Sequence, residues 1–147
     1  RIALDAARPL PFRAVFDRIL VDAPCSGTGT LARNPEIRWR LAAADIAELH
    51  CRQVALLTNA FEMLAPGGRL VYSTCSLEPE ENEHVVNEVL QGRPNFRCIG
   101  GQAALQPYLR ADADPTRLFG KDGAFRTLPS EHATDGFFAA AIEKQAD

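Results

Sequence analysis

Two cysteines that follow two strand-like apolar runs are the residues of this chain whose types and positions could do chemistry. Cys25 lies in DAPCSGTG (22–29), after an apolar run, and Cys75 lies in STCS (73–76), after another. In an open parallel sheet, ligands bind in the crevice beyond the carboxyl ends of the strands. Two thiols brought to that edge indicate covalent chemistry rather than packing.

Length and composition are those of a globular protein with one domain. The 147 residues are 46% hydrophobic and 24% charged, with a net charge of −3, so we treat residues 1–147 as a single domain with its own core. This charge excludes a globally basic nucleic-acid binder, although arginines are frequent before residue 52 and a local basic patch remains open. No apolar run is as long as a membrane span.

The cysteine spacing indicates the redox environment. The four cysteines are widely spaced and form no C-x-x-C pair, which argues against a zinc cluster and gives no disulfide framework. No charged-then-apolar leader opens the chain. We therefore expect a reducing, cytoplasmic location and no bound metal.

The elements that must position the two thiols alternate between strands and helices. The apolar run at 19–21 predicts that strand 17–21 is covered on both faces. Asp45 followed by Glu48 resembles the capping box of a helix, and the prolyl-glycyl-glycine at 66–68 ends that helix. This alternation predicts an α/β sheet. We expect strands at 1–4, 17–21, 69–73, 124–128 and 136–142, helices at 45–64 and 79–90, an ordered loop at 22–40, and irregular structure at 95–121.

Three segments resemble one known family. They are residues 17–29 continued by RNPEIRW (33–39), residues 66–76 followed by PEENE (79–83), and TDGFFA (134–139). These segments are similar to the RNA (cytosine-5) methyltransferases, and they best match the bacterial branch that modifies 16S ribosomal RNA, the RsmB/Sun/Fmu type. The resemblance implies part of a Rossmann-like class I methyltransferase sheet with flanking helices, its last strand antiparallel.

The resemblance also implies roles for particular residues. It implies transfer of a methyl group from S-adenosylmethionine to cytosine C5 in RNA, with Cys75 as the nucleophile and Cys25 assisting product release. Asp22 matches a family aspartate at the active centre that also borders the cofactor. Asp5 matches the aspartate that contacts the adenine ring, and ribosomal RNA is the expected partner.

The chemistry explains why thiols are needed. Cytosine C5 is a poor nucleophile, and a thiolate that adds to C6 turns C5 into an enamine-like carbon that can attack a sulfonium methyl group. A helix beginning near Pro79 would favour the Cys75 thiolate. Glu78, Glu80 and Glu81 would oppose it, so we expect them to face solvent or to bind backbone amides.

The same reasoning gives the other groups of the site. Cys25 would remove the C5 proton or assist its removal, and Asp22 would hydrogen-bond the cytosine amino edge. Gly27 and Gly29 would let the loop approach the substrate closely, and the target base must be unstacked.

Several positions have structural readings that stay open. Arg33, Arg38 and Arg40 fit phosphate contacts and fit a solvated face equally well. We expect Trp39 to anchor its loop in the core rather than to stack on a base. Asp5 fits a strand-end turn as well as a cofactor contact. Two remaining cysteines are expected to be buried small hydrophobes, namely Cys51 and Cys98.

The resemblance covers only the C-terminal half of the family's catalytic domain. The family's glycine-rich cofactor loop and the acidic residue after its second strand are not in this sequence, so we expect the isolated chain to bind S-adenosylmethionine weakly or not at all. The competing hypothesis is a non-catalytic RNA-binding or assembly fragment that keeps the fold. Strand 17–21 would lack one neighbour, and its open edge and uncovered apolar face predict self-association.

Overall fold

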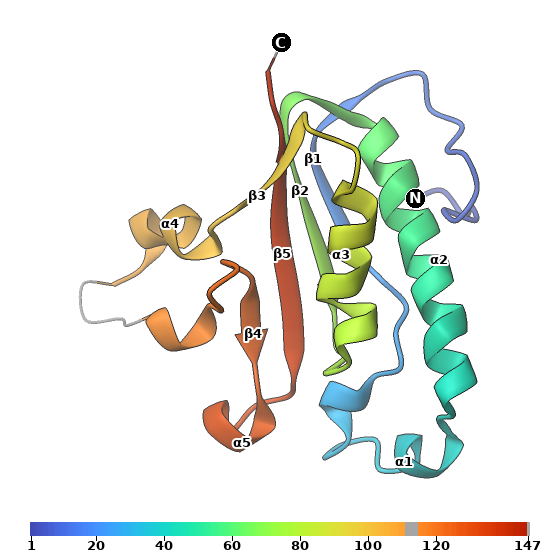
Figure 1. Cartoon of the computed structure of the whole chain (residues 1–147), viewed down its shortest axis with the longest axis vertical. Coiled ribbons are helices and arrows are strands. Elements are labelled where there is room, and N and C mark those ends of the chain that lie inside the picture. Colours follow the sequence, from blue (N-terminus) through green and yellow to red (C-terminus); the bar gives the residue numbers. More distant parts are fainter. Residues whose placement is uncertain (111–114, 147) are drawn as a thin grey trace.

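The chain folds into a mixed sheet with helices packed on one face (Figure 1). The computed structural model describes residues 1–110 and 115–146. The strands are β1 (Phe16–Asp22), β2 (Leu64–Thr74), β3 (Phe96–Ile99), β4 (Phe125–Thr127) and β5 (Phe137–Lys144). The helices are α1 (Ile37–Arg40), α2 (Ala43–Glu62), α3 (Glu83–Leu90), α4 (Gly101–Leu105) and α5 (Pro129–His132). Short 3₁₀ turns lie at Thr28–Thr30, Pro79–Glu81, Gln106–Tyr108 and Thr116–Leu118.

The strand order places the carboxyl ends of two parallel strands side by side. The sheet runs β1-β2-β5-β3, with β4 also paired to β5. β1 and β2 are parallel, with Asp22 opposite Ser73, whereas β5 is antiparallel to β2. Both cysteine loops therefore leave the sheet at the same edge, and the expected partial methyltransferase-like sheet with an antiparallel last strand is confirmed.

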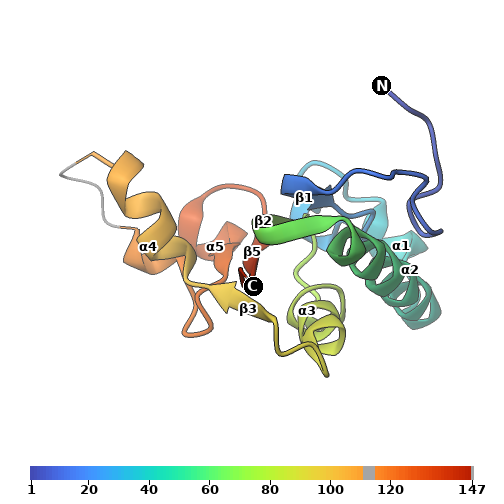
Figure 2. The ribbon, with the colours of Figure 1, turned by 90° about the horizontal axis from the view of Figure 1, so that it is seen from above.

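The core lies between one face of the sheet and two helices. Figure 2 shows α2 and α3 on the same side of the strands. α2 buries one stripe of side chains at helical spacing, which includes Leu57 and Phe61. They meet the buried residues Leu70 and Tyr72 of β2 and Ile142 of β5.

The start of α2 corrects one detail of the sequence prediction. The carboxylate of Asp45 accepts a hydrogen bond from the backbone N–H of Ala42 at 2.8 Å. Asp45 is thus the third residue of the helix rather than its cap, and it satisfies a donor that the helix leaves open.

The edge strand β1 is in the expected place but is not covered on both faces. Its partner is β2, and its other edge has no partner strand among residues 1–110 and 115–146. Leu20 is 68% exposed on the face opposite to α2. The prediction that this strand is buried on both faces was therefore wrong, because only the face of β1 that points toward α2 is packed.

Three further expectations are corrected. Residues 1–4 form no strand, since none of the described strands pairs with them. The loop at 22–40 contains a 3₁₀ turn and α1. The stretch at 95–121, of which 111–114 lie outside the described residues, contains β3 and α4 rather than only irregular structure, because β3 is held by pairing with β5. Within the described part of the chain, no helix is long and apolar enough to cross a membrane.

Candidate active site

The two thiols meet at the common edge of β1 and β2. The Sγ atoms of Cys25 and Cys75 are 3.3 Å apart, and both residues are half-buried. Backbone hydrogen bonds hold the two loops together: Ala23 N–H donates to Ser73 O at 2.9 Å, and Gly29 N–H donates to Cys75 O at 2.9 Å. The structure therefore brings together the residues expected to act as nucleophile and as release group.

Gly29 lets the first loop lie directly against the second. A Cβ atom at Gly29 would lie 2.3 Å from Gly136 O and 2.8 Å from Cys75 O. Gly136 N–H in turn donates to Gly29 O at 2.8 Å. The close approach that this glycine permits is thus to the backbone around Cys75, a contact that the sequence did not indicate, while an approach to substrate stays a prediction.

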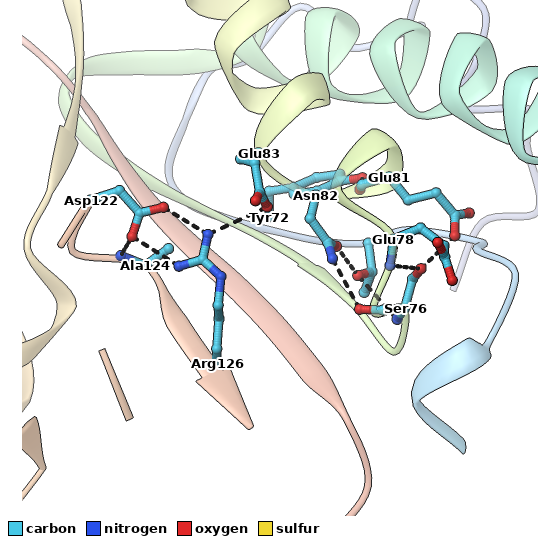
Figure 3. A network of polar contacts seen from close by, with 10 residues as sticks. Tyr72, Ser76, Glu78, Glu81, Asn82, Glu83, Asp122, Ala124 and Arg126 are labelled. Carbon is cyan, nitrogen blue, oxygen red and sulfur yellow. Dashed lines mark hydrogen bonds and ion pairs between the residues drawn. The ribbon is translucent and has the colours of Figure 1, made fainter. Parts of the chain in front are cut away.

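A second set of bonds fixes the backbone on both sides of Cys75. The Thr74 hydroxyl donates to Asn82 Oδ1 at 2.5 Å, and the Asn82 amide donates to Ser76 O at 3.0 Å. Figure 3 shows Asn82 reaching from the start of α3 to Ser76. The nucleophile candidate is therefore held between two anchored neighbours.

Glu81 occupies the centre of the site and was not identified as part of it from the sequence. It is wholly buried, and its carboxylate accepts the N–H of Ser26 at 2.9 Å. The expectation that acidic residues here bind backbone amides is correct for Glu81, while Glu80 is exposed. Helical spacing could have located it, because Glu81 stands four and eight residues before the buried Val85 and Val89.

Burial is the main cause of a raised pKa at Cys25. Burial, the hydrogen bond with Cys75 and the Cys75 charge together raise the pKa of Cys25 to about 12. Cys25 is therefore a protonated thiol at neutral pH in the free site, and it can donate its S–H to the Cys75 sulfur.

Asp22 is a second acidic residue at this edge of the sheet. It is exposed at the end of β1, and Ser73 Oγ donates to its Oδ1 at 2.9 Å. An exposed carboxylate there fits an acceptor for a hydroxyl or amino group of a cofactor or base. Asp5 bonds within its own loop, to Ala7 N–H at 3.1 Å and to Arg8 at 3.4 Å.

Of the three arginines expected to contact RNA, Arg40 lies beside Cys25. Arg40 and Cys25 both line a hollow of about 310 Å³. Arg38 lines a separate hollow of about 260 Å³ with Trp39. Arg33 is exposed and forms an ion pair with Asp135, so its charge is already compensated in part.

Two expectations of burial are wrong. Trp39 is 77% exposed on the short helix α1 and is not a core anchor, because no side of α1 is buried. Cys51 and Cys98 are exposed as well, since Cys51 lies on the solvent side of α2 and Cys98 on the short strand β3.

Similarity to solved structures first defines the class of protein. The chain aligns with a structure described as a methyltransferase homolog protein from Pyrococcus horikoshii, at 36% identity and a TM-score of 0.64, over 89% of this chain and 40% of that one. It also aligns with NSun6 from the same organism, solved with SFG, at 28% identity and a TM-score of 0.77, over 99% of this chain and 34% of that one. The fold is that of part of a methyltransferase.

The family follows from the sequence comparison. The model of the family described as 16S rRNA methyltransferase RsmB/F matches residues 2–143, and the chain belongs to that family. Ribosomal RNA small subunit methyltransferase B of Vibrio cholerae is 42% identical over 130 residues, which are 88% of this chain and 26% of that protein. A probable methyltransferase B of Bacillus subtilis is 37% identical over 88% of this chain and 28% of the relative. The chain thus spans about a quarter of the length of these relatives.

Proposed function

We propose that this chain is one domain carrying the two-cysteine part of the active site of an S-adenosylmethionine-dependent methyltransferase acting on cytosine C5 in ribosomal RNA. The observation that carries the proposal is the 3.3 Å separation of the Cys25 and Cys75 sulfurs at the ends of two parallel strands. Family membership supports methyl transfer and the ribosomal substrate. Such a substrate would place the protein in the cytoplasm, and the reaction would belong to the full-length protein.

The first step is an addition by Cys75. Its thiolate forms an S–C6 bond to an unstacked cytosine, and the C5–C6 π electrons move into the ring and enrich C5. Because C5 is bonded to C6, a thiol 3.3 Å from the Cys75 sulfur is in reach of C5. The two cysteines therefore suit two adjacent atoms of one ring.

Asp22 is the residue proposed to serve both the base and the cofactor. When bound, S-adenosylmethionine supplies an electrophilic methyl group for C5. Asp22 would accept a hydrogen bond from the cytosine amino group and border the cofactor, as its exposed carboxylate at the end of β1 allows. Asp5 remains the proposed adenine contact.

Product release is the proposed role of Cys25. After addition the Cys25 thiol loses its S–H proton to solvent, and the resulting thiolate takes the C5 proton. The C5–H electrons re-form the C5–C6 double bond, and the C6–S bond breaks to return a thiolate to Cys75. Burial keeps the pKa of Cys25 raised in the free site, but the contributions of the Cys75 hydrogen bond and charge disappear once that sulfur is bonded to C6. The pKa of Cys25 therefore falls after addition, when a base is needed.

Substitution of each cysteine in the full-length protein tests this function. We expect Cys75→Ala to abolish transfer of labelled methyl groups to 16S ribosomal RNA. Cys25→Ala should accumulate a covalent protein–RNA adduct that survives denaturing electrophoresis, and Cys51→Ala is the matched control with wild-type activity. Methylation by Cys75→Ala would show that the nucleophile is wrong. RNA binding by the wild type without any methyl transfer would favour the non-catalytic alternative.

The isolated chain has two expected properties of its own. Calorimetry should detect weak or no binding of S-adenosylmethionine, and tight binding would contradict the partial-pocket proposal. The open edge of β1 and the exposed Leu20 favour association of chains. Sedimentation at high concentration should therefore show dimers or larger species, and a stable monomer would count against self-association.

A further inference from the structure

A buried carboxylate without a cation lies between the two cysteine loops. Glu81 is wholly buried, and none of the described ion pairs includes it. An ionised carboxylate in such a place is costly unless hydrogen bonds replace its water. The hydrogen-bond donors to Glu81 therefore determine which parts of the chain this carboxylate holds together.

The donors come from three separate segments of the chain. Glu81 Oε1 accepts Ser26 N–H at 2.9 Å and Gln53 Nε2–H at 3.0 Å. Glu81 Oε2 accepts the hydroxyls of Ser26 and Ser76, each at 2.5 Å. Each of the two carboxylate oxygens therefore has two donors. One carboxylate thus joins both cysteine loops and the α2 helix.

Each serine in this set is the next residue after a thiol. Ser26 follows Cys25 and Ser76 follows Cys75, and their hydroxyls are also 3.2 Å from each other. Gln53 additionally donates to Pro24 O at 2.9 Å, just before Cys25. Fixing these neighbours fixes the backbone from which both sulfurs project.

The carboxylate is separable from the fold of its own segment. The backbone oxygen of Glu81 accepts the buried Tyr72 hydroxyl at 2.7 Å, and Asn82 is held by Thr74 and by Ser76 O. Figure 3 shows Glu81 and Asn82 at the start of α3, above Ser76. These bonds remain when the Glu81 side chain becomes an amide of the same shape.

We propose that Glu81 is a positioning residue of the two-cysteine site, whose carboxylate sets the separation of the Cys25 and Cys75 sulfurs through Ser26 and Ser76. The proposal rests on the proposed function for its chemical meaning, because both sulfurs must reach adjacent atoms of one base. Its geometric content, the thiol separation, can be measured without RNA or cofactor.

Phenylarsine oxide reports that separation directly. Its arsenic forms a bond to each of two adjacent thiols, and its oxygen leaves with both thiol protons as water, so bridging requires sulfurs held close together. The full-length protein is treated with the reagent, and the bridged species is followed by intact mass spectrometry. Cys25→Ala, which has lost one of the two sulfurs, gives the background to subtract.

Glu81→Gln should slow bridging at least about tenfold, since displacement of reacting groups by about 1 Å costs on the order of 100-fold. Glu80→Gln, the same change at the exposed neighbour, should stay within about twofold of wild type. In the methylation assay, Glu81→Gln should lower kcat with KM for RNA unchanged. A folded Glu81→Gln protein that bridges at the wild-type rate would overturn the proposal.

A second variant keeps the test decisive if Glu81→Gln does not fold. Ser26→Ala removes one hydroxyl link at a half-buried position and leaves the Ser26 N–H bond to Glu81. Slower bridging by this variant supports positioning, and wild-type bridging overturns it. Wild-type protein that bridges its thiols but methylates no RNA would instead reject the proposed function and leave the positioning role standing.

Discussion

The surroundings of Glu81 and the segment at 33–40 are two regions with opposite character. Around Glu81, charged and hydroxyl groups are buried and bonded to one another within the chain. At 33–40, Arg38 and Trp39 are exposed and line a shallow hollow. The comparison indicates that the chain itself fixes the geometry of the two thiols, whereas the side chains of Arg38 and Trp39 are exposed and available to the proposed RNA.

The largest expected effect comes from forcing the preorganised region apart. Gly29→Ala places a methyl group 2.3 Å from Gly136 O, so the two cysteine loops must separate. We expect a loss of about 3 kcal/mol in the free energy of unfolding and no detectable methyl transfer. Urea unfolding of the full-length protein measures the first. Gly100→Ala, where a Cβ meets open space, is the control, and equal stability of the two variants would contradict the close packing.

Substitutions in the exposed segment at 33–40 should change RNA binding rather than the stability of the fold. If Arg38 and Arg40 contact RNA phosphates, the double change to Gln removes two contacts. The slope of log affinity against log salt should then become shallower by about 1.4 for single-stranded RNA. Filter binding across a salt series measures this slope. The control is Arg97→Gln, because the Arg97 side chain pairs with Glu143 on the sheet, and this variant should leave the slope unchanged. An unchanged slope in the double variant would assign Arg38 and Arg40 to a solvated face.

A smaller, pH-dependent effect on the free energy of unfolding is expected at His50, where α2 meets the segment before α3. Burial lowers the pKa of His50, but its hydrogen bonds to Glu80 O and to the Glu88 carboxylate outweigh burial and raise it above 6.5. A raised histidine pKa stabilises the fold below 6.5, and that stability is lost as the pH rises through the folded-state pKa. The loss should be less than about 1 kcal/mol for so exposed a pair.

Denaturant unfolding across this pH range tests the assignment to His50. His50→Gln should flatten the pH dependence of the unfolding midpoint, and the exposed His84→Gln should not. A pH dependence that survives in His50→Gln would place the titrating group elsewhere.

The smallest expected effect is on the stability of Trp39→Ala. Because Trp39 is 77% exposed, its removal should change the free energy of unfolding by no more than about 0.5 kcal/mol. The fully buried Phe61 is the contrast, with an expected loss of about 3–5 kcal/mol on change to Ala. Urea midpoints of the two variants make the comparison, and a large loss for Trp39→Ala would mean that other parts of the protein cover it.

Local patterns made part of this structure predictable. The apolar runs before the two cysteines and the helical spacing in α2 are properties of a few consecutive residues, so both strands and the helix were located. The expectation that residues 66–68 end the helix was wrong, because α2 ends at Glu62 and residues 66–68 belong to β2. β3 was missed because four residues carry little pattern and are held by pairing with β5. Trp39 was misplaced because an apolar type in a loop does not reveal which side faces solvent.

The site shows the same division between local and long-range information. The sequence indicated which cysteines meet, since each ends a strand of a parallel pair. It did not indicate how closely they meet, because that distance depends on bonds spanning 55 residues between Ser26 and Glu81. Gln53 and Asn82 were missed for the same reason. An amide side chain in or beside a helix does not reveal a role in the site until its distant hydrogen-bond partner is known.

The position of β5 also orders events during synthesis. β5 is the last described strand in the chain, yet it lies inside the sheet and pairs with β2, β3 and β4. Gly136, immediately before it, donates to Gly29 O beside the Cys75 loop. While β5 is still inside the ribosome, β3 and β4 have no partner strand and β2 is paired only with β1. The cysteine pair also lacks the Gly136 contact to Gly29. The backbone around Cys75 therefore gains this last contact only when β5 emerges, after both cysteine loops and Glu81 have been made.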